Sequence, residues 1–265
     1  MTITHITSPA NPLLKELRRL ARDNTAYRKQ GRVWLEGDHL CDAAFARGIQ
    51  PDYVVISESY WLQAQYKYAQ AAIKIIVIPD AVFGGISGLD SPGNMGFVIA
   101  LPADATLQVQ LPSVVLDRMQ DAGNVGSILR SAAAFGFKQV LALKGTAALW
   151  APKVLRAGMG AHFGLRLVEG LLLTDLEALT VPLLVTSSHQ GQPLEALCRV
   201  SGGLPWPCAW AMGHEGQGVS DELVARAHLA VRIAQPGGEE SLNVAAAAAI
   251  CLHASVLAQY TSTLS

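Results

Sequence analysis

The sequence feature that most constrains the fold is a buried strand followed by a glycine-containing break and a helix. Residues 113–116 form an apolar, β-branched run, which is typical of a strand buried in a parallel sheet. The break from Gly123 to Gly126 predicts a tight loop, and Ser127–Phe135 is predicted to be a helix with small residues on its packing face. Because glycines let the backbone approach a ligand and helix N-termini favour anions, this stretch predicts a ligand site.

One interpretation of this stretch is a dinucleotide-binding fingerprint, which needs three glycines spaced G-x-G-x-x-G. Only Gly123 and Gly126 are present, and no acidic ribose partner follows in the right context. A dehydrogenase is therefore disfavoured. What distinguishes the stretch is Asn124 before the predicted helix and Arg130 within it, which place a side-chain amide and a permanent cation beside one loop.

The composition describes a globular chain with room for two domains. Its 265 residues are 51% hydrophobic and 15% charged. We expect a cytoplasmic protein without membrane association, because no apolar run is long enough to span a bilayer and the N-terminus lacks the pattern of a secretion signal. The four cysteines lack metal-ligand spacing, so we predict free buried thiols and no metal site.

The first hundred residues alternate predicted strands and helices, as a small α/β domain does. Residues 11–32 hold seven basic and two acidic residues in a chain whose net charge is −1. Leucines at helical spacing would be buried, which leaves the basic side chains in solvent. This surface is either an ordinary solvated helix face or a contact for nucleic-acid phosphates. The candidates for such contacts are Lys15, Arg18, Arg22, Arg28 and Lys29.

Two later glycine-rich loops carry further candidate residues. Residues 209–218 predict a strand that enters a loop with three glycines around Glu215. Residues 231–244 predict a second strand and loop, followed by an apolar, buried helix to about residue 259 with Ser241 and Asn243 at its start. Taken singly, these residues are an ordinary loop charge, helix cap and first-turn residue. Thr186 ends another apolar strand, at the sheet edge where ligands bind.

Together, three motifs closely resemble the SpoU, or TrmH-like, RNA ribose 2′-O-methyltransferases. They are N-x-G-x-x-x-R-x-x-x-x-F-G at 124–136, G-x-E-G-x-G at 213–218 and I-x-x-x-G-x-x-x-S-L-N-V at 233–244. Residues 11–15 and 36–37 resemble the ribosomal-protein-like substrate-binding domain of many members. The chain departs from the family pattern near the cofactor loops, which bears on cofactor affinity. The departures are His214, Ala234, Gln235 and Ala245.

The resemblance implies an α/β fold with two domains. A smaller N-terminal α/β domain for RNA substrate, residues 1–102, would precede a parallel-sheet domain with a deep trefoil knot, residues 111–265. It further implies S-adenosylmethionine as cofactor, RNA as partner with ribosomal RNA favoured over transfer RNA, and a homodimer through the knotted domain. The implied catalytic residues are Asn124, Arg130, Glu215, Ser241 and Asn243. The implied cofactor-binding residues are Thr186, Gly213, Gly218, Ile233 and Leu242.

Methyl transfer to a ribose 2′-hydroxyl requires the oxygen in line with the sulfonium methyl and the loss of its proton. Because a guanidinium has a pKa above about 12, we expect Arg130 to bind phosphate and stabilise the developing alkoxide rather than to act as a base. Asn124 would orient Arg130 or the ribose. The alternative is a catalytically inactive RNA-binding protein of the same fold. Loss of Arg130, Glu215 or Asn243 would favour that alternative, and all three are present.

Overall fold

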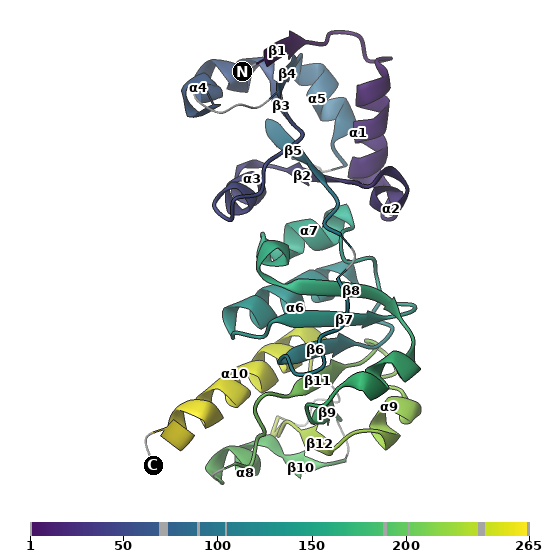
Figure 1. The fold of residues 1–265 in the computed structure, drawn as a ribbon, viewed down its shortest axis with the longest axis vertical. Helices are drawn as coiled ribbons and strands as arrows, with labels where there is room; N and C mark the ends of the chain where they lie inside the picture. The colour runs from purple at the N-terminus through teal and green to yellow at the C-terminus, as the bar shows by residue number, and fades with distance from the viewer. Residues whose placement is uncertain are drawn as a thin grey trace. The chain divides into compact units, whose positions relative to one another are not determined.

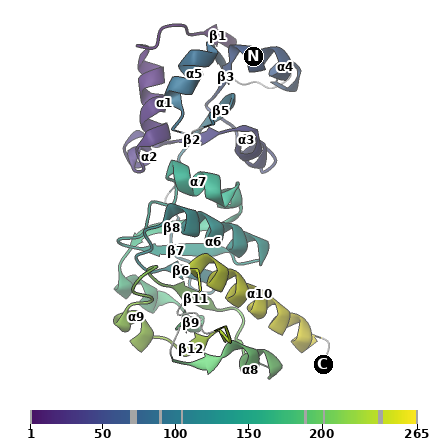
Figure 2. The same ribbon diagram turned by 180° about the vertical axis from the view of Figure 1, so that it is seen from behind.

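The computed structural model describes residues 2–68, 74–88, 91–103, 105–187, 190–200, 202–237 and 242–263. The chain forms two compact units, residues 1–103 with 150–163 and residues 104–149 with 164–265 (Figures 1 and 2). Each unit has its own sheet. Within the described residues, none of the helices combines the length and the apolar character needed to cross a bilayer. The cytoplasmic location stays a prediction.

The first unit is built on a five-stranded mixed sheet. The strand order is β1 (Thr2–His5), β4 (Lys74–Ile78), β3 (Tyr53–Ser57), β5 (Met95–Ala100) and β2 (Arg32–Glu36). β1, β4 and β3 are parallel, and β5 is antiparallel to both of its neighbours. The helices are α1 (Pro12–Arg22), α2 (Ala26–Gln30), α3 (Asp38–Phe45), α4 (Glu58–Tyr68), α5 (Asp80–Ile86) and α7 (Pro152–Gly158).

The alternating strands and helices predicted for this unit are present, with two differences. β1 was not predicted, and α5 forms although it contains two adjacent glycines, a composition typical of a loop. Gly84 and Gly85 disfavour a helix, but Phe83 and Ile86 are buried, and that packing outweighs the weak helix propensity. On α1, Leu14, Leu17 and Leu20 are buried as their spacing predicts.

The second unit is built on a seven-stranded, wholly parallel sheet, which confirms the α/β class. Its strand order is β10 (Gln192–Pro193), β12 (Leu229–Arg232), β9 (Leu183–Thr186), β11 (Ala209–Met212), β6 (Ser113–Leu116), β7 (Gln139–Leu143) and β8 (Arg166–Leu171). The helices of this unit are α6 (Ala122–Ala134), α8 (Leu194–Arg199), α9 (Asp221–Ala225) and α10 (Val244–Thr263). The 3-10 helix η2 (Leu173–Ala178) follows β8, and η1 (Ala161–Gly164) lies at the boundary with the first unit.

The long helix α10 lies beside α6 and contacts β11 (Figures 1 and 2). Trp210 of β11 is fully buried, and its Nε1 donates a hydrogen bond to the Ser255 hydroxyl of α10 at 2.9 Å. This contact fixes α10 against the centre of the sheet. The start of α10 is thereby held near the start of α6, where Asn243 contacts Asn124.

The tight loop predicted over residues 123–126 is wrong, because these residues form the first turns of α6. The helix begins at Ala122 because the Asp121 side chain caps it. Asp121 Oδ1 accepts a hydrogen bond from the Asn124 backbone N–H at 2.7 Å, which satisfies one of the N–H groups that a helix start leaves unpaired. Asn124 is therefore a helical residue, and its orientation follows from the helix.

Candidate active site at the carboxyl edge of the parallel sheet

The loops that carry the predicted site residues leave the parallel sheet at one edge. β12, β9, β11 and β6 are parallel neighbours, so their carboxyl ends lie together. This is the edge at which open α/β sheets bind ligands. Thr186 ends β9, the loop 213–218 follows β11, and Ile233 follows β12. Residues far apart in the sequence are thus brought to one place by the strand order.

A cavity of about 310 Å³ opens at this edge, a volume that suits a small organic ligand. The structure brings together around it all five residues predicted to bind cofactor: Thr186, Gly213, Gly218, Ile233 and Leu242. Two of the four departures from the family pattern, His214 and Gln235, also line it. Glu215 lines the cavity too, as do Gly216 and Val244 of the quoted motifs. Sequence reasoning did not single out the remaining lining residues, which are Ser187, Gln217, Val231 and Ala247.

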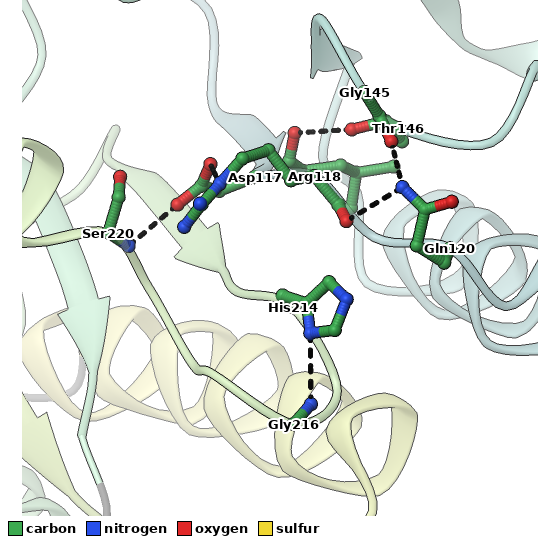
Figure 3. A network of polar contacts seen from close by, with 9 residues as sticks. Asp117, Arg118, Gln120, Gly145, Thr146, His214, Gly216 and Ser220 are labelled. Atoms are coloured by element: carbon green, nitrogen blue, oxygen red, sulfur yellow. Dashed lines mark hydrogen bonds and ion pairs between the residues drawn. The ribbon is translucent and has the colours of Figure 1, made fainter.

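The loop after β11 is closed by its own backbone. The N–H of His214 donates to the Gly218 carbonyl at 2.9 Å, and the N–H of Gly218 donates to the His214 carbonyl at 2.8 Å. A Cβ on Gly213 would lie 2.0 Å from the carbonyl carbon of Gly218, so only glycine fits there. His214 Nδ1 accepts from the Gly216 N–H at 3.1 Å (Figure 3), which requires that Nδ1 carry no proton.

Three motif residues from separate segments meet in one hydrogen-bond network at the cavity. The Asn124 amide donates to Glu215 Oε1 at 3.5 Å, and the Asn243 amide donates to Asn124 Oδ1 at 3.0 Å. Asn243 Oδ1 in turn accepts from the backbone N–H groups of Ala245 and Ala246 at 2.9 and 3.1 Å. The network therefore links the loop after β11 to the starts of α6 and α10.

Glu215 is the acceptor at the centre of this network. Its carboxylate also accepts from the backbone N–H groups of Gln120 at 3.2 Å and Asp121 at 3.0 Å. Partial burial raises the pKa of Glu215, but hydrogen bonds from backbone N–H groups and the Asn124 amide outweigh it, so the pKa lies below its ordinary value. The carboxylate is ionised at neutral pH, which suits an orienting role.

Sequence reasoning missed Gln120 and Asp121, which hold Glu215. Asp121 had a readable signal, because an aspartate three residues before Asn124 fits a helix cap. Gln120 had no signal in the sequence. Its side chain donates to the carbonyl groups of Arg118 and of Gly145, which is 25 residues later (Figure 3). Such a contact becomes visible only when β6 and β7 are paired.

One predicted catalytic residue among those described, Arg130, does not join the network. Arg130 is exposed on α6, six residues after Asn124, which corresponds to about 9 Å along the helix and about 120° around it. Among the described residues we find no hydrogen bond or ion pair to Arg130. Ser241 lies outside the described residues, so its predicted role stays a prediction.

The cysteines and the other potential metal ligands are dispersed. Cys41, Cys208 and Cys251 are free and buried, but Cys198 is exposed, contrary to the prediction of four buried thiols. Burial raises the pKa of the Cys208 thiol to about 12, which makes it unreactive. Where the structure describes the chain, no cluster of three or more His, Cys, Asp or Glu side chains could hold a metal ion.

The five predicted RNA-contacting residues lie on α1 and α2 of the first unit. Arg18, Arg22 and Arg28 each donate to an oxygen of the same unit, at 2.9 to 3.1 Å. The side chains of Lys15 and Lys29 are exposed, and neither side chain forms a hydrogen bond or ion pair in the part of the chain that the structure describes. The basic surface thus contains both structural arginines and unpaired lysines.

Two protein-family models match separate parts of the chain. Residues 112–253 match the model of the SpoU rRNA Methylase family, and residues 11–96 match that of the MRM3-like substrate binding domain. The first match spans more than half of the chain and contains the whole Asn124–Glu215–Asn243 network.

Individual relatives match over most of the chain. An uncharacterized tRNA/rRNA methyltransferase of Synechocystis sp. is 31% identical, over 95% of this chain and 93% of its own. The 23S rRNA (guanosine(2553)-2′-O)-methyltransferase RlmP of Bacillus subtilis is 27% identical, over 94% and 97%. The human mitochondrial rRNA methyltransferase 3 is 32% identical over 62% of this chain, a match that spans only 41% of that protein.

Solved structures share the whole fold. The crystal structure of an RNA 2′-O ribose methyltransferase superposes with a TM-score of 0.78 at 27% identity, and the match covers 99% of this chain and 100% of the other. The SpoU methyltransferase AviRb of Streptomyces viridochromogenes, in complex with AdoMet, superposes with a TM-score of 0.81 over 95% of this chain and 100% of its own. At 20% identity, the AviRb match shows a common fold alone.

Proposed function

Because the chain belongs to the SpoU rRNA methylase family, we propose that it transfers a methyl group from S-adenosylmethionine to a ribose 2′-hydroxyl of RNA. The observation that carries the proposal is the cavity of about 310 Å³ beside the Asn124–Glu215–Asn243 network. Relatives that act on ribosomal RNA support ribosomal RNA as the substrate class, with transfer RNA as the second choice.

The cavity fits S-adenosylmethionine in size and chemistry. Ile233 and Leu242 supply apolar walls that suit an adenine ring, and the glycine loop 213–218 supplies a close backbone surface. Gly213 has no room for a Cβ against the Gly218 and Val219 backbone, so the loop can close on itself in this shape only with glycine there. When bound, the cofactor supplies an electrophilic methyl group. The protein has to place the ribose oxygen in line with it.

The network gives Asn124 a fixed orientation for that task. One N–H of its amide is held by Glu215 and its Oδ1 by Asn243, so the second N–H is free to donate to a ribose oxygen. Glu215 stays ionised and holds the start of α6 through Gln120 and Asp121. Asn124 is thus a positioning group for the ribose. Arg130 would stabilise the negative charge that develops on the ribose oxygen.

Calorimetric titration of the full chain with S-adenosylmethionine tests the cofactor half of the proposal. We expect saturable binding with one site per chain, and no binding of NAD at the same concentration, because the third glycine of a dinucleotide fingerprint is absent. Binding of NAD without S-adenosylmethionine would instead favour the dehydrogenase interpretation.

The proposal includes a homodimer through the second unit. α10 was predicted to be buried, yet Ile250 and Leu257 on it are 40% and 50% exposed in the single chain. They lie seven residues apart and so on one face of the helix, and α10 lies beside α6, which carries Arg130. An apolar face of this kind suits packing against a second copy of the chain. In such a dimer, Arg130 of one subunit can complete the active site of the other.

Replacing Ile250 and Leu257 by glutamate should convert the dimer to a monomer, because buried unpaired carboxylates oppose association. Light scattering measures the mass, and methyl transfer should fall together with it. Val200→Glu is the matched control, since Val200 is also an exposed apolar residue of this unit, at 64%. A wild-type protein that is monomeric and active would contradict the dimer.

The trefoil knot is also part of the proposal. It is supported by the strand order, in which β12 lies between β10 and β9 while the helix that follows it crosses to α6 and β11. Most folds avoid threaded connections. Here, threading would place residues 242–244 beside both the cavity and the start of α6, as the contacts of Leu242 and Asn243 require.

The lysines and the arginines of the basic surface on the first unit are predicted to respond differently to substitution. Replacing Lys15 and Lys29 by glutamine should weaken RNA binding and reduce its logarithmic salt slope by roughly 0.7 to 0.9 per lost contact, with no change in unfolding temperature. Arg22→Gln should lower the unfolding temperature instead, because Arg22 donates to the Gly85 and Ser87 carbonyls at 2.9 and 3.1 Å. An unchanged salt slope in the folded lysine variant would return this surface to an ordinary solvated helix face.

A further inference from the structure

A second depression, of about 270 Å³, lies along the same sheet edge as the cofactor cavity. Arg118 follows β6, Lys144 follows β7, and residues 171–173 end β8, so the carboxyl ends of three neighbouring strands form it. Asp117 and Glu222 supply the other charges. We infer that Arg118 and Lys144 bind a phosphodiester of the RNA substrate, an inference that rests on the proposed function.

Arg118 has an unusual backbone for a residue with a long side chain. Its φ is +56°, in the left-handed region that glycine adopts freely and other residues adopt at a cost in stability. Residues held in such conformations cluster at functional sites. A cation at a position better suited to glycine therefore points to a use for its side chain.

The surroundings of Arg118 orient its guanidinium group. Its Nε donates to Asp117 Oδ1 at 3.0 Å, and Asp117 is buried, with its other oxygen accepting from the Ser220 N–H at 2.7 Å (Figure 3). The stem of Arg118 lies close to Gly145, where an added Cβ would be 3.4 Å from Arg118 Cγ. Among the described residues, the two terminal nitrogens have no hydrogen bond, which leaves a fork suited to two phosphate oxygens.

Lys144 adds a second cation to the same depression. It is exposed, and we find no ion pair for it within the described ranges of the chain. Its neighbour Gly145 lies close to the Arg118 stem, so the two cationic side chains leave nearby backbone. A compact ammonium beside a planar guanidinium is a combination that serves a phosphate better than a carboxylate-bearing peptide.

The depression is placed next to the methyl-transfer site. The strand order β12–β9–β11–β6–β7–β8 puts the cofactor cavity at the first three strands and the depression at the last three, with about 4.8 Å between neighbours. Gln120 connects them, because its side chain donates to the Arg118 carbonyl at 3.4 Å and its backbone N–H donates to Glu215 at 3.2 Å. An RNA strand along this edge would have its ribose at the network and a neighbouring phosphate at Arg118 and Lys144.

Arg118→Gly and Lys144→Gln test the inference in the full chain, with unmodified ribosomal RNA transcribed in vitro as the probe. We expect each variant to raise the KM for RNA about tenfold and to reduce the salt slope of RNA binding by roughly 0.7 to 0.9, with S-adenosylmethionine affinity unchanged. In Arg118→Gly, glycine relieves the left-handed conformation but the buried Asp117 loses its ion-pair partner, so the unfolding temperature is measured only to establish that the variant is folded. Lys138→Gln is the matched control, because Lys138 is exposed at the opposite end of β7.

Equal RNA affinity and salt slope in wild type, Lys144→Gln and Lys138→Gln would overturn the inference, as would a folded Arg118→Gly variant that keeps the wild-type RNA affinity. Inorganic phosphate should compete with RNA more strongly for the wild-type protein than for Arg118→Gly. Equal competition for both proteins would also count against the inference. A wild-type protein that binds RNA but transfers no methyl group contradicts the proposed function instead. The difference in RNA binding between the variants can still be measured in that case.

Discussion

Arg130→Ala is expected to lower the turnover number for methyl transfer by a factor of about 10² to 10³, while the Kd for S-adenosylmethionine and the unfolding temperature stay at wild-type values. Arg130 is exposed on α6, and the described residues contain no hydrogen bond or ion pair to it, so its removal leaves no unpaired partner. Its predicted task is to bind phosphate and stabilise the alkoxide in the transition state. Arg130→Lys should also fail, because an ammonium cannot reproduce the planar fork.

Steady-state kinetics at saturating cofactor, with calorimetry for the cofactor alone, separate these effects. Arg199→Ala is the control, since Arg199 is an exposed arginine of the same unit on α8. Wild-type turnover in Arg130→Ala would remove Arg130 from the chemistry. Loss of cofactor binding in Arg130→Ala would show that Arg130 helps to bind the cofactor.

A mixture of two inactive variants tests whether Arg130 acts across the proposed dimer. When Arg130→Ala and Glu215→Ala subunits exchange, each mixed dimer contains one site with both residues intact if Arg130 serves the partner. Random exchange makes half of the dimers mixed, so about a quarter of the activity should return. No recovery in a demonstrated mixed dimer would place both residues in the site of one chain.

Gly213→Ala is expected to weaken S-adenosylmethionine binding by at least about 100-fold. The added Cβ would lie 2.0 Å from the Gly218 carbonyl carbon and 2.1 Å from the Val219 nitrogen, and both are backbone atoms that cannot rotate away. The loop must open, which breaks the paired hydrogen bonds between His214 and Gly218 that shape the cavity. The absence of a cofactor-induced rise in unfolding temperature measures the loss.

The matched control for Gly213→Ala is Gly216→Ala in the same loop. A Cβ at Gly216 would meet only the His214 ring, at 3.8 to 3.9 Å, so this variant should keep its fold and its cofactor-induced stabilisation. Normal cofactor binding by Gly213→Ala would show that the cavity at this loop is not the cofactor site.

The sequence predicted the parallel sheet well because its strands are short apolar runs. The residues 113–116 and 209–212 are buried neighbours, and their patterns required no tertiary information. The motif residues Asn124, Glu215 and Asn243 could be selected by resemblance, and the structure joins them. Their mutual hydrogen bonds depend on the strand order, which local patterns do not encode.

The features that sequence reasoning missed are those that depend on contacts between distant segments or on backbone conformation. The start of α6 depends on the Asp121 cap, and Gln120 acts through Gly145. The left-handed φ of Arg118 has no signal in its residue type, because arginine rarely adopts it. The place of Arg130 in the reaction depends on a second chain in our proposal, so neither the sequence nor one chain alone defines it.

The most direct test of the central claim is methyl transfer from S-adenosylmethionine labelled in its methyl group to unmodified ribosomal RNA, followed by mapping of the label. We predict that the label enters the RNA at the 2′-oxygen of a defined nucleotide, makes the adjacent phosphodiester resistant to alkali, and enters about 10² to 10³ times more slowly with Arg130→Ala. RNA that is bound but remains unlabelled, or that carries the label on a base, would contradict the account, and bound but unlabelled RNA would favour a catalytically inactive RNA-binding protein of the same fold.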